Sequence, residues 1–235
     1  MNDLTIIYYT ANNNNEHFMQ NTQKCLLEAV GDTSIISVSF KPTVIGNNCT
    51  NICIGEQKRS NFMLYKQILM GAKEAKTKYV ATAEDDTLYP PEHFMYRPPE
   101  DTISYDLNKW SMFSWTNPPI FSKRENRRTM NMCVATRETL IRTLEERYTK
   151  YPIFEEIPKN TFDYYWGEPG RFEDHLGIPQ VNRDKFECKI PSIMFSTPEA
   201  LGFLHLGTRK AHSPIRSTEI PYWGKAEDIL KLYKI

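Results

Sequence analysis

The chain has 235 residues, enough for one large domain or two small ones, and 40% of them are hydrophobic, which is typical of a globular protein with an ample core. Its 29 basic and 29 acidic side chains cancel, so no overall field draws it to nucleic acid or to a membrane, and any polyanion needs a local basic patch. Scattered cysteines indicate free thiols, and no apolar stretch approaches the ~20 residues that span a bilayer, so we expect a soluble cytoplasmic protein.

The first ninety residues alternate between short apolar β-type runs and amphipathic helical patterns. In chain order they predict a strand over 4–9, a loop of helix-capping residues, a helix that ends near residue 29, a strand over 35–40, a loop over 41–56, a helix over 60–76 and a strand over 79–83. This alternation predicts a mostly parallel sheet with crossover helices, which is an α/β fold of the Rossmann-like type.

The remaining residues predict a smaller part with antiparallel strands. Strands are expected over 102–106 and 110–115, as an antiparallel pair, followed by an amphipathic helix over 137–148 and a terminal helix over 226–233. Repeats, low-complexity tracts and a convincing linker are absent from the sequence. We therefore predict a single domain over residues 1–235.

Three consecutive acids, Glu84, Asp85 and Asp86, directly follow the third predicted strand. Ligands of open parallel sheets bind beyond the carboxyl ends of the strands, and the polar loop that begins at Thr10 falls at the same edge. Mg²⁺ and Mn²⁺ prefer carboxylate oxygens and share substrate phosphates. The three acids are therefore a candidate metal site, and the alternative is a solvated acidic turn before Pro90.

A second acidic pair, Glu173 and Asp174, follows a turn rich in glycine and proline, where a helix can begin. A carboxylate at a helix N-terminus stays ionised and can accept a proton from an alcohol. Helix capping by Asp174 is the simpler alternative.

The tail contains further charged candidates between residues 204 and 212. His205 and His212 are possible metal ligands, and Arg209 with Lys210 could neutralise a diphosphate. A lone histidine is more often structural, so that alternative stays open for both histidines.

A basic stretch follows a run of aromatic residues near the middle of the chain. Trp115 belongs to the aromatic run, and Arg124, Arg127 and Arg128 belong to the basic stretch. Basic side chains beside aromatic rings suit phosphate contacts and base stacking. The alternative is a solvated loop over a packed aromatic core.

Taken in order, these residues resemble nucleotide-sugar glycosyltransferases of the GT-A type, above all the inverting family 2. The loop after the first strand resembles that family's nucleotide-binding loop, the second helix resembles its Arg-x-Asn helix, and both acidic clusters match its metal motif and its Glu-Asp pair. The positions that correspond to nucleotide-sugar-binding residues are Thr10, Ala11, Asn12, Arg59, Asn61, Lys66, Glu84 and Asp85, with Arg209 and Lys210 as further candidates.

The resemblance implies a fold, a reaction and roles for individual residues. The expected fold is GT-A, with residues 1–100 binding the nucleotide sugar, a UDP-sugar, and residues 101–235 shaping the acceptor side. Asp86, with Asp85 and His205, would hold Mn²⁺ or Mg²⁺. Asp174, beside Glu173, would deprotonate the acceptor hydroxyl while one sugar is transferred with inversion.

The acceptor and two rival functions remain open at the sequence level. The chain also resembles transferases of bacterial viruses, some of which glycosylate hydroxymethylated pyrimidines in DNA. With this acceptor, the basic stretch would have a role in binding DNA. Glycans, lipid-linked sugars and small molecules are the other acceptors. A sugar nucleotidyltransferase is a rival, although it would have a Gly-rich loop where this chain has the asparagines 12–15. A non-catalytic carbohydrate- or nucleic-acid-binding module is the second rival.

Overall fold

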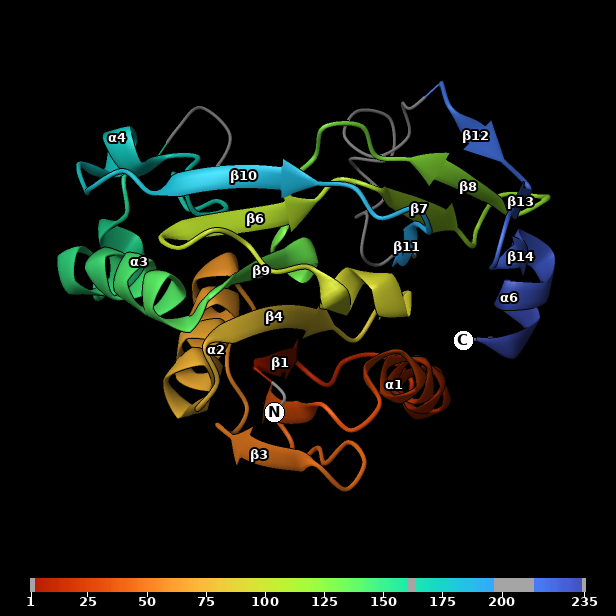
Figure 1. The fold of residues 1–235 in the computed structure, drawn as a ribbon, viewed down its shortest axis with the longest axis horizontal. Coiled ribbons are helices and arrows are strands. Elements are labelled where there is room, and N and C mark those ends of the chain that lie inside the picture. Colours follow the sequence, from red (N-terminus) through yellow and green to blue (C-terminus); the bar gives the residue numbers. More distant parts are fainter. Residues whose placement is uncertain (1–2, 160–163, 197–213, 234–235) are drawn as a thin grey trace.

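The computed structural model describes residues 3–159, 164–196 and 214–233, and within these ranges the larger sheet has seven strands in the order β10-β6-β9-β4-β1-β2-β3 (Figure 1). Its strands are β1 (Leu4–Thr10), β2 (Ser34–Ser39), β3 (Cys49–Cys53), β4 (Tyr79–Glu84), β6 (Thr102–Asp106), β9 (Cys133–Thr136) and β10 (Asn182–Phe186). The strands β1 to β4 run parallel, β10 is parallel to β6, and β9 is antiparallel to both of its neighbours. The carboxyl ends of β1 and β4 therefore lie at one edge of the sheet.

Helices cover both faces of this sheet. On one face, α1 (Glu16–Val30) packs Leu26 and Val30 against apolar side chains of β1. On the other face, α2 (Asn61–Glu74) packs against the alternate side chains of β1 and β2, and α3 (Arg137–Lys150) packs against α2, β6 and β9. Asn15 and Ser60 begin α1 and α2, because each side chain accepts a hydrogen bond from a backbone N–H of the first turn.

Gly71 sets how closely α2 approaches the sheet. A Cβ atom at this position would lie 2.5 Å from Cγ2 of Ile7 on β1 and 3.3 Å from Cγ2 of Val38 on β2. Only a residue without a side chain fits this close contact between the last turn of α2 and the two strands.

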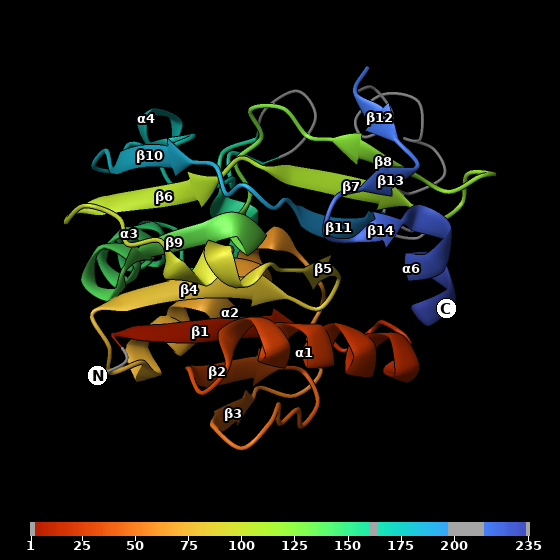
Figure 2. The same ribbon diagram turned by 45° about the vertical axis from the view of Figure 1, so that its right-hand side comes forward.

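A smaller sheet packs beside the first and is mostly antiparallel. Its described strands are, in spatial order, β12 (Arg216–Ser217), β8 (Ile120–Lys123), β7 (Lys109–Phe113), β11 (Ser192–Ser196) and β5 (Thr87–Leu88). The hairpin of β13 (Glu219–Ile220) and β14 (Gly224–Lys225) and the helix α6 (Ala226–Leu232) lie beside it (Figure 2). Short helical segments complete the described chain: η1 (Pro91–Met95), η2 (Met130–Met132), η3 (Phe154–Glu156) and α4 (Glu173–Leu176).

The architecture confirms the predicted α/β class, with a mostly parallel sheet, flanking helices and a smaller antiparallel part. Two local predictions were wrong. The strands β6 and β7 do not pair with each other, because β6 lies between β9 and β10 while β7 lies between β8 and β11. The predicted loop over 41–56 contains β3, a polar edge strand whose half-exposed residues leave no apolar alternation. The division into two functional halves stays a prediction.

No helix in the described part of the chain is both long and apolar enough to cross a membrane.

Candidate functional site

The carboxyl ends of β1 and β4 frame a cavity of about 590 Å³, which we call the first cavity. Several residues predicted to bind a nucleotide sugar or a metal line it, namely Thr10, Ala11, Arg59, Asn61, Glu84, Asp85 and Asp86. Sequence reasoning placed the loop after the first strand and the three acids at one sheet edge, and the structure brings them together there.

A second cavity of about 730 Å³ adjoins the first. The two cavities share Tyr9, Asn61, Leu64 and Glu84 in their linings, so they form one continuous cleft. The second cavity is lined on its other sides by the segments 126–131 and 164–172. Glu84 therefore lies where the two cavities meet.

The two strand ends are held together by side chains that lie far apart in sequence. The Thr10 hydroxyl donates to Oδ2 of Asp85 over 2.5 Å. The buried amide of Gln67 on α2 donates to the carbonyl oxygens of Thr10, at 2.9 Å, and of Val38, at 2.8 Å. Sequence reasoning missed Gln67, whose only signal is a polar residue on the apolar face of a predicted helix.

Burial and mutual repulsion make the acidic cluster electrostatically costly. Burial raises the pKa of Asp85 to about 7, and the charge of Asp86 adds to this effect, while the Thr10 hydroxyl and the Arg59 charge oppose it. Burial also raises the pKa of Glu84 well above its usual range, again with a contribution from Asp86. Crowded carboxylates with raised pKa values favour a bound cation, so the donor set fits Mn²⁺ or Mg²⁺.

Asp86 forms hydrogen bonds with two strands of the smaller sheet. Its carbonyl oxygen accepts the backbone N–H of Phe195 on β11 at 2.8 Å, and its Oδ1 accepts the Thr87 hydroxyl at 2.9 Å. The side chain stays partly exposed to the first cavity. This placement is compatible with the predicted role of Asp86 as a metal ligand.

A buried lysine that sequence reasoning missed lies beside the acids. Lys109, at the start of β7, is 1% exposed, and its ammonium group donates to the hydroxyl of Thr129. Burial and, to a smaller extent, the Arg127 charge lower its pKa to about 7, against the opposing effect of the charges of Glu84 and Asp86. Its signal in the sequence was only a lysine at the edge of a predicted strand.

The second predicted acidic pair takes part in local structure. Glu173 is 1% exposed and forms a buried ion pair with Arg147 on α3, with 2.5 Å between its Oε1 and the guanidinium Nη2. Asp174 is exposed and accepts a hydrogen bond from the side-chain amide of Gln180 at 2.6 Å. Within the described residues, neither acid belongs to the lining of the two cavities. The base role of Asp174 stays a prediction.

The other predicted residues divide among several places. Arg127 and Arg128 line the second cavity, whereas Arg124 is 6% exposed and donates to the Ser111 hydroxyl at 2.8 Å. Trp115 is 40% exposed, against the ring of Phe113.

Two described residues that were predicted to bind the nucleotide sugar, Asn12 and Lys66, do not line the first cavity. Asn12 has a left-handed backbone, with φ of 53°, and bonds Thr43 and Lys41 of the loop after β2. Lys66 is exposed on α2. The tail candidates lie outside the described residues: His205, Arg209, Lys210 and His212.

A buried polar cluster unforeseen in the sequence contains His93, Asp106 and Cys188, whose possible ligand atoms lie within 4.8 Å of one another. Asp106 Oδ2 lies 3.1 Å from His93 Nδ1, and Asp106 Oδ1 accepts backbone N–H groups of Asn108 and Cys188. The carboxylate thus already binds three partners. These hydrogen bonds account for the burial of the carboxylate, whereas Nε2 of His93 is buried without a hydrogen-bond partner among the described residues.

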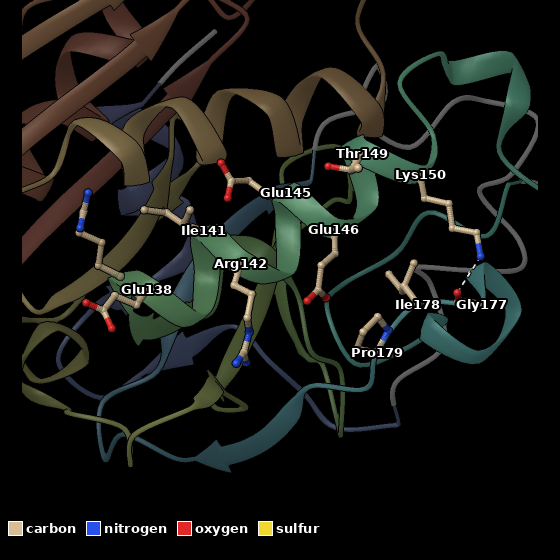
Figure 3. Close-up of a pocket in the computed structure, with 11 residues that line it drawn as sticks. Glu138, Ile141, Arg142, Glu145, Glu146, Thr149, Lys150, Gly177, Ile178 and Pro179 are labelled. Carbon is tan, nitrogen blue, oxygen red and sulfur yellow. Dashed lines mark hydrogen bonds between the residues drawn. The ribbon is translucent and has the colours of Figure 1, made fainter.

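A groove on the outer surface of α3 lies apart from the strand ends (Figure 3). Ile141 on α3 and Ile178 after α4 form its apolar part, and the Lys150 ammonium group crosses it to the Gly177 carbonyl oxygen at 2.6 Å. The rest of its lining consists largely of solvated charged side chains. This groove has none of the converging polar groups of a catalytic site.

Comparisons with known proteins give structural likenesses only. No known protein family and no curated protein matches the chain. Its fold is similar to that of GlyE, a glycosyltransferase of Streptococcus pneumoniae TIGR4, with 9% identity and a TM-score of 0.47, over 78% of this chain and 45% of GlyE. This chain therefore spans about half the length of GlyE.

Two further structures have comparable scores. One is a glycosyltransferase involved in glycosylation of the major capsid of PBCV-1, with 11% identity and a TM-score of 0.46, over 81% of this chain and 92% of that one. The other is residues 1–349 of S. aureus TarS in complex with UDP-GlcNAc, with 11% identity and a TM-score of 0.45, over 83% and 58% of the two chains. At these scores and identities, nothing about the activity of this chain follows from the likenesses.

Proposed function

We propose that the protein is a glycosyltransferase that moves one sugar from a nucleoside diphosphate sugar to an acceptor hydroxyl, with inversion at the anomeric carbon. The strongest support is the position of Glu84, Asp85 and Asp86 at the end of β4, inside a cavity whose other walls include Thr10 and Arg59. A cavity of about 590 Å³ can hold a ligand of nucleotide size. Crowded carboxylates favour a divalent cation, and such a cation also binds a diphosphate.

In this proposal the first cavity binds the donor. Asp86, supported by Asp85, would hold Mn²⁺ or Mg²⁺, which supplies positive charge for the leaving diphosphate. Arg59 adds positive charge near the phosphates, and Asn61 stands at the N-terminus of α2, where backbone N–H groups attract anions. Thr10 fixes the orientation of Asp85 through their hydrogen bond.

The second cavity would bind the acceptor, for which we propose a hydroxymethylated pyrimidine in phage DNA. Arg127, Arg128, Arg171 and Arg183 belong to its lining, although the whole chain has no net charge. Arginines neutralise backbone phosphates, and the half-buried rings of Tyr164 and Phe172 in this lining suit stacking with a base. A phage-encoded protein of this kind would act in the host cytoplasm.

Release of nucleoside diphosphate from a panel of UDP-, GDP-, ADP- and dTDP-sugars tests the reaction. We expect one donor to be cleaved in the presence of Mn²⁺, and Asp86→Ala to lose both cleavage and Mn²⁺-dependent donor binding. Asp228→Ala is the matched control, because this acid is exposed on α6 and pairs only with Lys231 among the described residues. Release of pyrophosphate from a nucleoside triphosphate and a sugar 1-phosphate, supplied in a parallel reaction, would indicate a sugar nucleotidyltransferase instead. Binding of a donor without its cleavage would indicate a binding module.

Mass spectrometry tests the acceptor. Duplex DNA that contains 5-hydroxymethylcytosine or 5-hydroxymethyluracil is incubated with the donor that the protein cleaves. We expect a mass gain of one sugar per modified base and none with unmodified DNA. Donor cleavage without any gain on DNA would contradict the acceptor proposal and leave the transferase proposal standing.

A further inference from the structure

The second cavity is lined by a carboxylate that no sequence motif singled out. Glu168 lies in the turn between Trp166 and Gly170, its side chain is 18% exposed, and it lines the same cavity as Glu84. Its negative charge acts on the buried Lys109, whose ammonium group also responds to Glu84 and Asp86. The charges of Glu84 and Glu168 thus both act on Lys109. Because Glu84 and Glu168 also line the same cavity, the acidic strand end and Glu168 are neighbours within the cleft.

The backbone of this turn is held rigidly. The guanidinium group of Arg147 is fully buried and donates to the carbonyl oxygens of Gly167, at 2.6 Å, and Glu168, at 3.4 Å. The Tyr105 hydroxyl donates to the carbonyl oxygen of Pro169 at 3.1 Å. Glu173 is the counter-ion of Arg147, so this buried acid stabilises the turn instead of facing the cavity.

The carboxylate of Glu168 keeps one oxygen available. Its Oε2 lies 3.1 Å from Nη1 of Arg171, whereas its Oε1 accepts no hydrogen bond from the described residues. A carboxylate that is oriented through one oxygen can accept a proton through the other. Asp174 lacks this placement, because it is exposed outside the described cavity linings and bonds Gln180.

We infer that Glu168, rather than Asp174, is the catalytic base of the transfer, an inference that rests on the proposed function. As the acceptor oxygen bonds to the anomeric carbon, its proton passes to Oε1 of Glu168. The bond between the anomeric carbon and the diphosphate oxygen breaks, and its electron pair leaves with the nucleoside diphosphate. Arg171 orients the carboxylate, and Arg147 with Glu173 positions the turn.

The test compares Glu168→Gln, Glu168→Asp and Asp174→Asn with the wild-type protein, and uses Glu187→Gln as an exposed control. Steady-state release of nucleoside diphosphate is measured from the donor that the wild type cleaves, with hydroxymethylated duplex DNA and with water as acceptors. Calorimetry gives the Kd of the nucleoside diphosphate in Mn²⁺, and thermal unfolding gives Tm.

Loss of a general base lowers kcat by about 10²- to 10⁴-fold. We expect this loss in Glu168→Gln with Kd and Tm unchanged, partial activity in Glu168→Asp, and near wild-type kcat in Asp174→Asn and Glu187→Gln. Activity that is retained in Glu168→Asp but lost in Glu168→Gln, with Kd and Tm unchanged in both, is a result that a structural role would not produce.

The possible results distinguish failure of the base role of Glu168 from failure of the proposed transferase function. Near wild-type kcat in Glu168→Gln, or a loss found only in Asp174→Asn, overturns the base assignment and leaves the transferase proposal intact. A lower Tm together with a weaker Kd in Glu168→Gln also overturns it, because the residue would then be structural. A wild-type protein that cleaves none of the donors removes the proposed function and the base role together.

Discussion

Replacement of Asp85 by asparagine should change how the stability of the protein depends on pH. The pKa of this buried carboxyl is raised from 3.8 to about 7, so the folded protein holds a proton there that the unfolded chain releases above pH 4. A group with a raised pKa contributes stability that is fully present at low pH and is lost as the pH rises through the folded pKa. The contribution of Asp85 is therefore lost between about pH 4 and pH 7.

The size of the effect follows from the two pKa values. A pKa of about 7 in place of 3.8 corresponds to a difference of about 4 kcal/mol, of which roughly 2–3 kcal/mol falls between pH 5 and pH 8. Asp85→Asn removes this part of the pH dependence. Lys109 does not mask it, because its pKa is lowered to about 7 and its own contribution to stability grows only above that pH.

Urea denaturation at pH 5, 6, 7 and 8, with EDTA present, measures the difference between the two proteins. We expect the free energy of unfolding of the wild type to fall relative to that of Asp85→Asn by roughly 2–3 kcal/mol over this range. Millimolar Mn²⁺ should then raise the stability of the wild type at pH 8 and much less at pH 5, where protons compete for the same oxygens. Identical pH profiles of the two proteins, or equal stabilisation of Asp86→Ala by Mn²⁺, would refute the account of the acidic cluster.

Three further predictions concern the acceptor wall and the fold. Arg127→Ala and Arg128→Ala should each lower the salt slope of DNA binding by about 1 in fluorescence anisotropy, and an unchanged slope would exclude phosphate contacts by these residues. Gly71→Ala should destabilise the protein by about 1–3 kcal/mol in urea denaturation, because the new Cβ would lie 2.5 Å from Ile7 Cγ2; a neutral result would mean that α2 shifts freely. Arg147→Met should lower the free energy of unfolding by about 3–5 kcal/mol, because Glu173 keeps a buried charge without its counter-ion, and a stable variant in thermal unfolding would disprove that ion pair.

The sequence predicted best the strands and helices whose pattern of apolar residues lies within one short segment of the chain. The apolar runs before Thr10 and Glu84 predicted buried parallel strands, and the edge where such strands end follows from their direction. The amphipathic patterns of α1, α2 and α3 predicted helices close to their observed bounds. The position of the first cavity was therefore predictable from residues next to one another in the chain.

The features that sequence could not predict depend on contacts between distant segments. Gln67 and Lys109 look unremarkable locally, and their importance comes from burial against strand ends that lie far away in the chain. Glu168 sits in a turn, while the adjacent Glu173–Asp174 pair offers the more conspicuous motif. Only the packing of α3 against that turn, through Arg147, separates the structural acid from the acid that faces the cavity.

The central claim, transfer of a sugar from a nucleotide donor, is tested most directly by following both products of one reaction. The wild-type protein, Mn²⁺, a donor and hydroxymethylated duplex DNA are combined, and nucleoside diphosphate and DNA mass are measured over time. The account predicts equal amounts of released nucleoside diphosphate and of DNA-bound sugar, with both absent in EDTA and in Asp86→Ala. Neither product with any donor, or equal yields from Asp86→Ala, would contradict it.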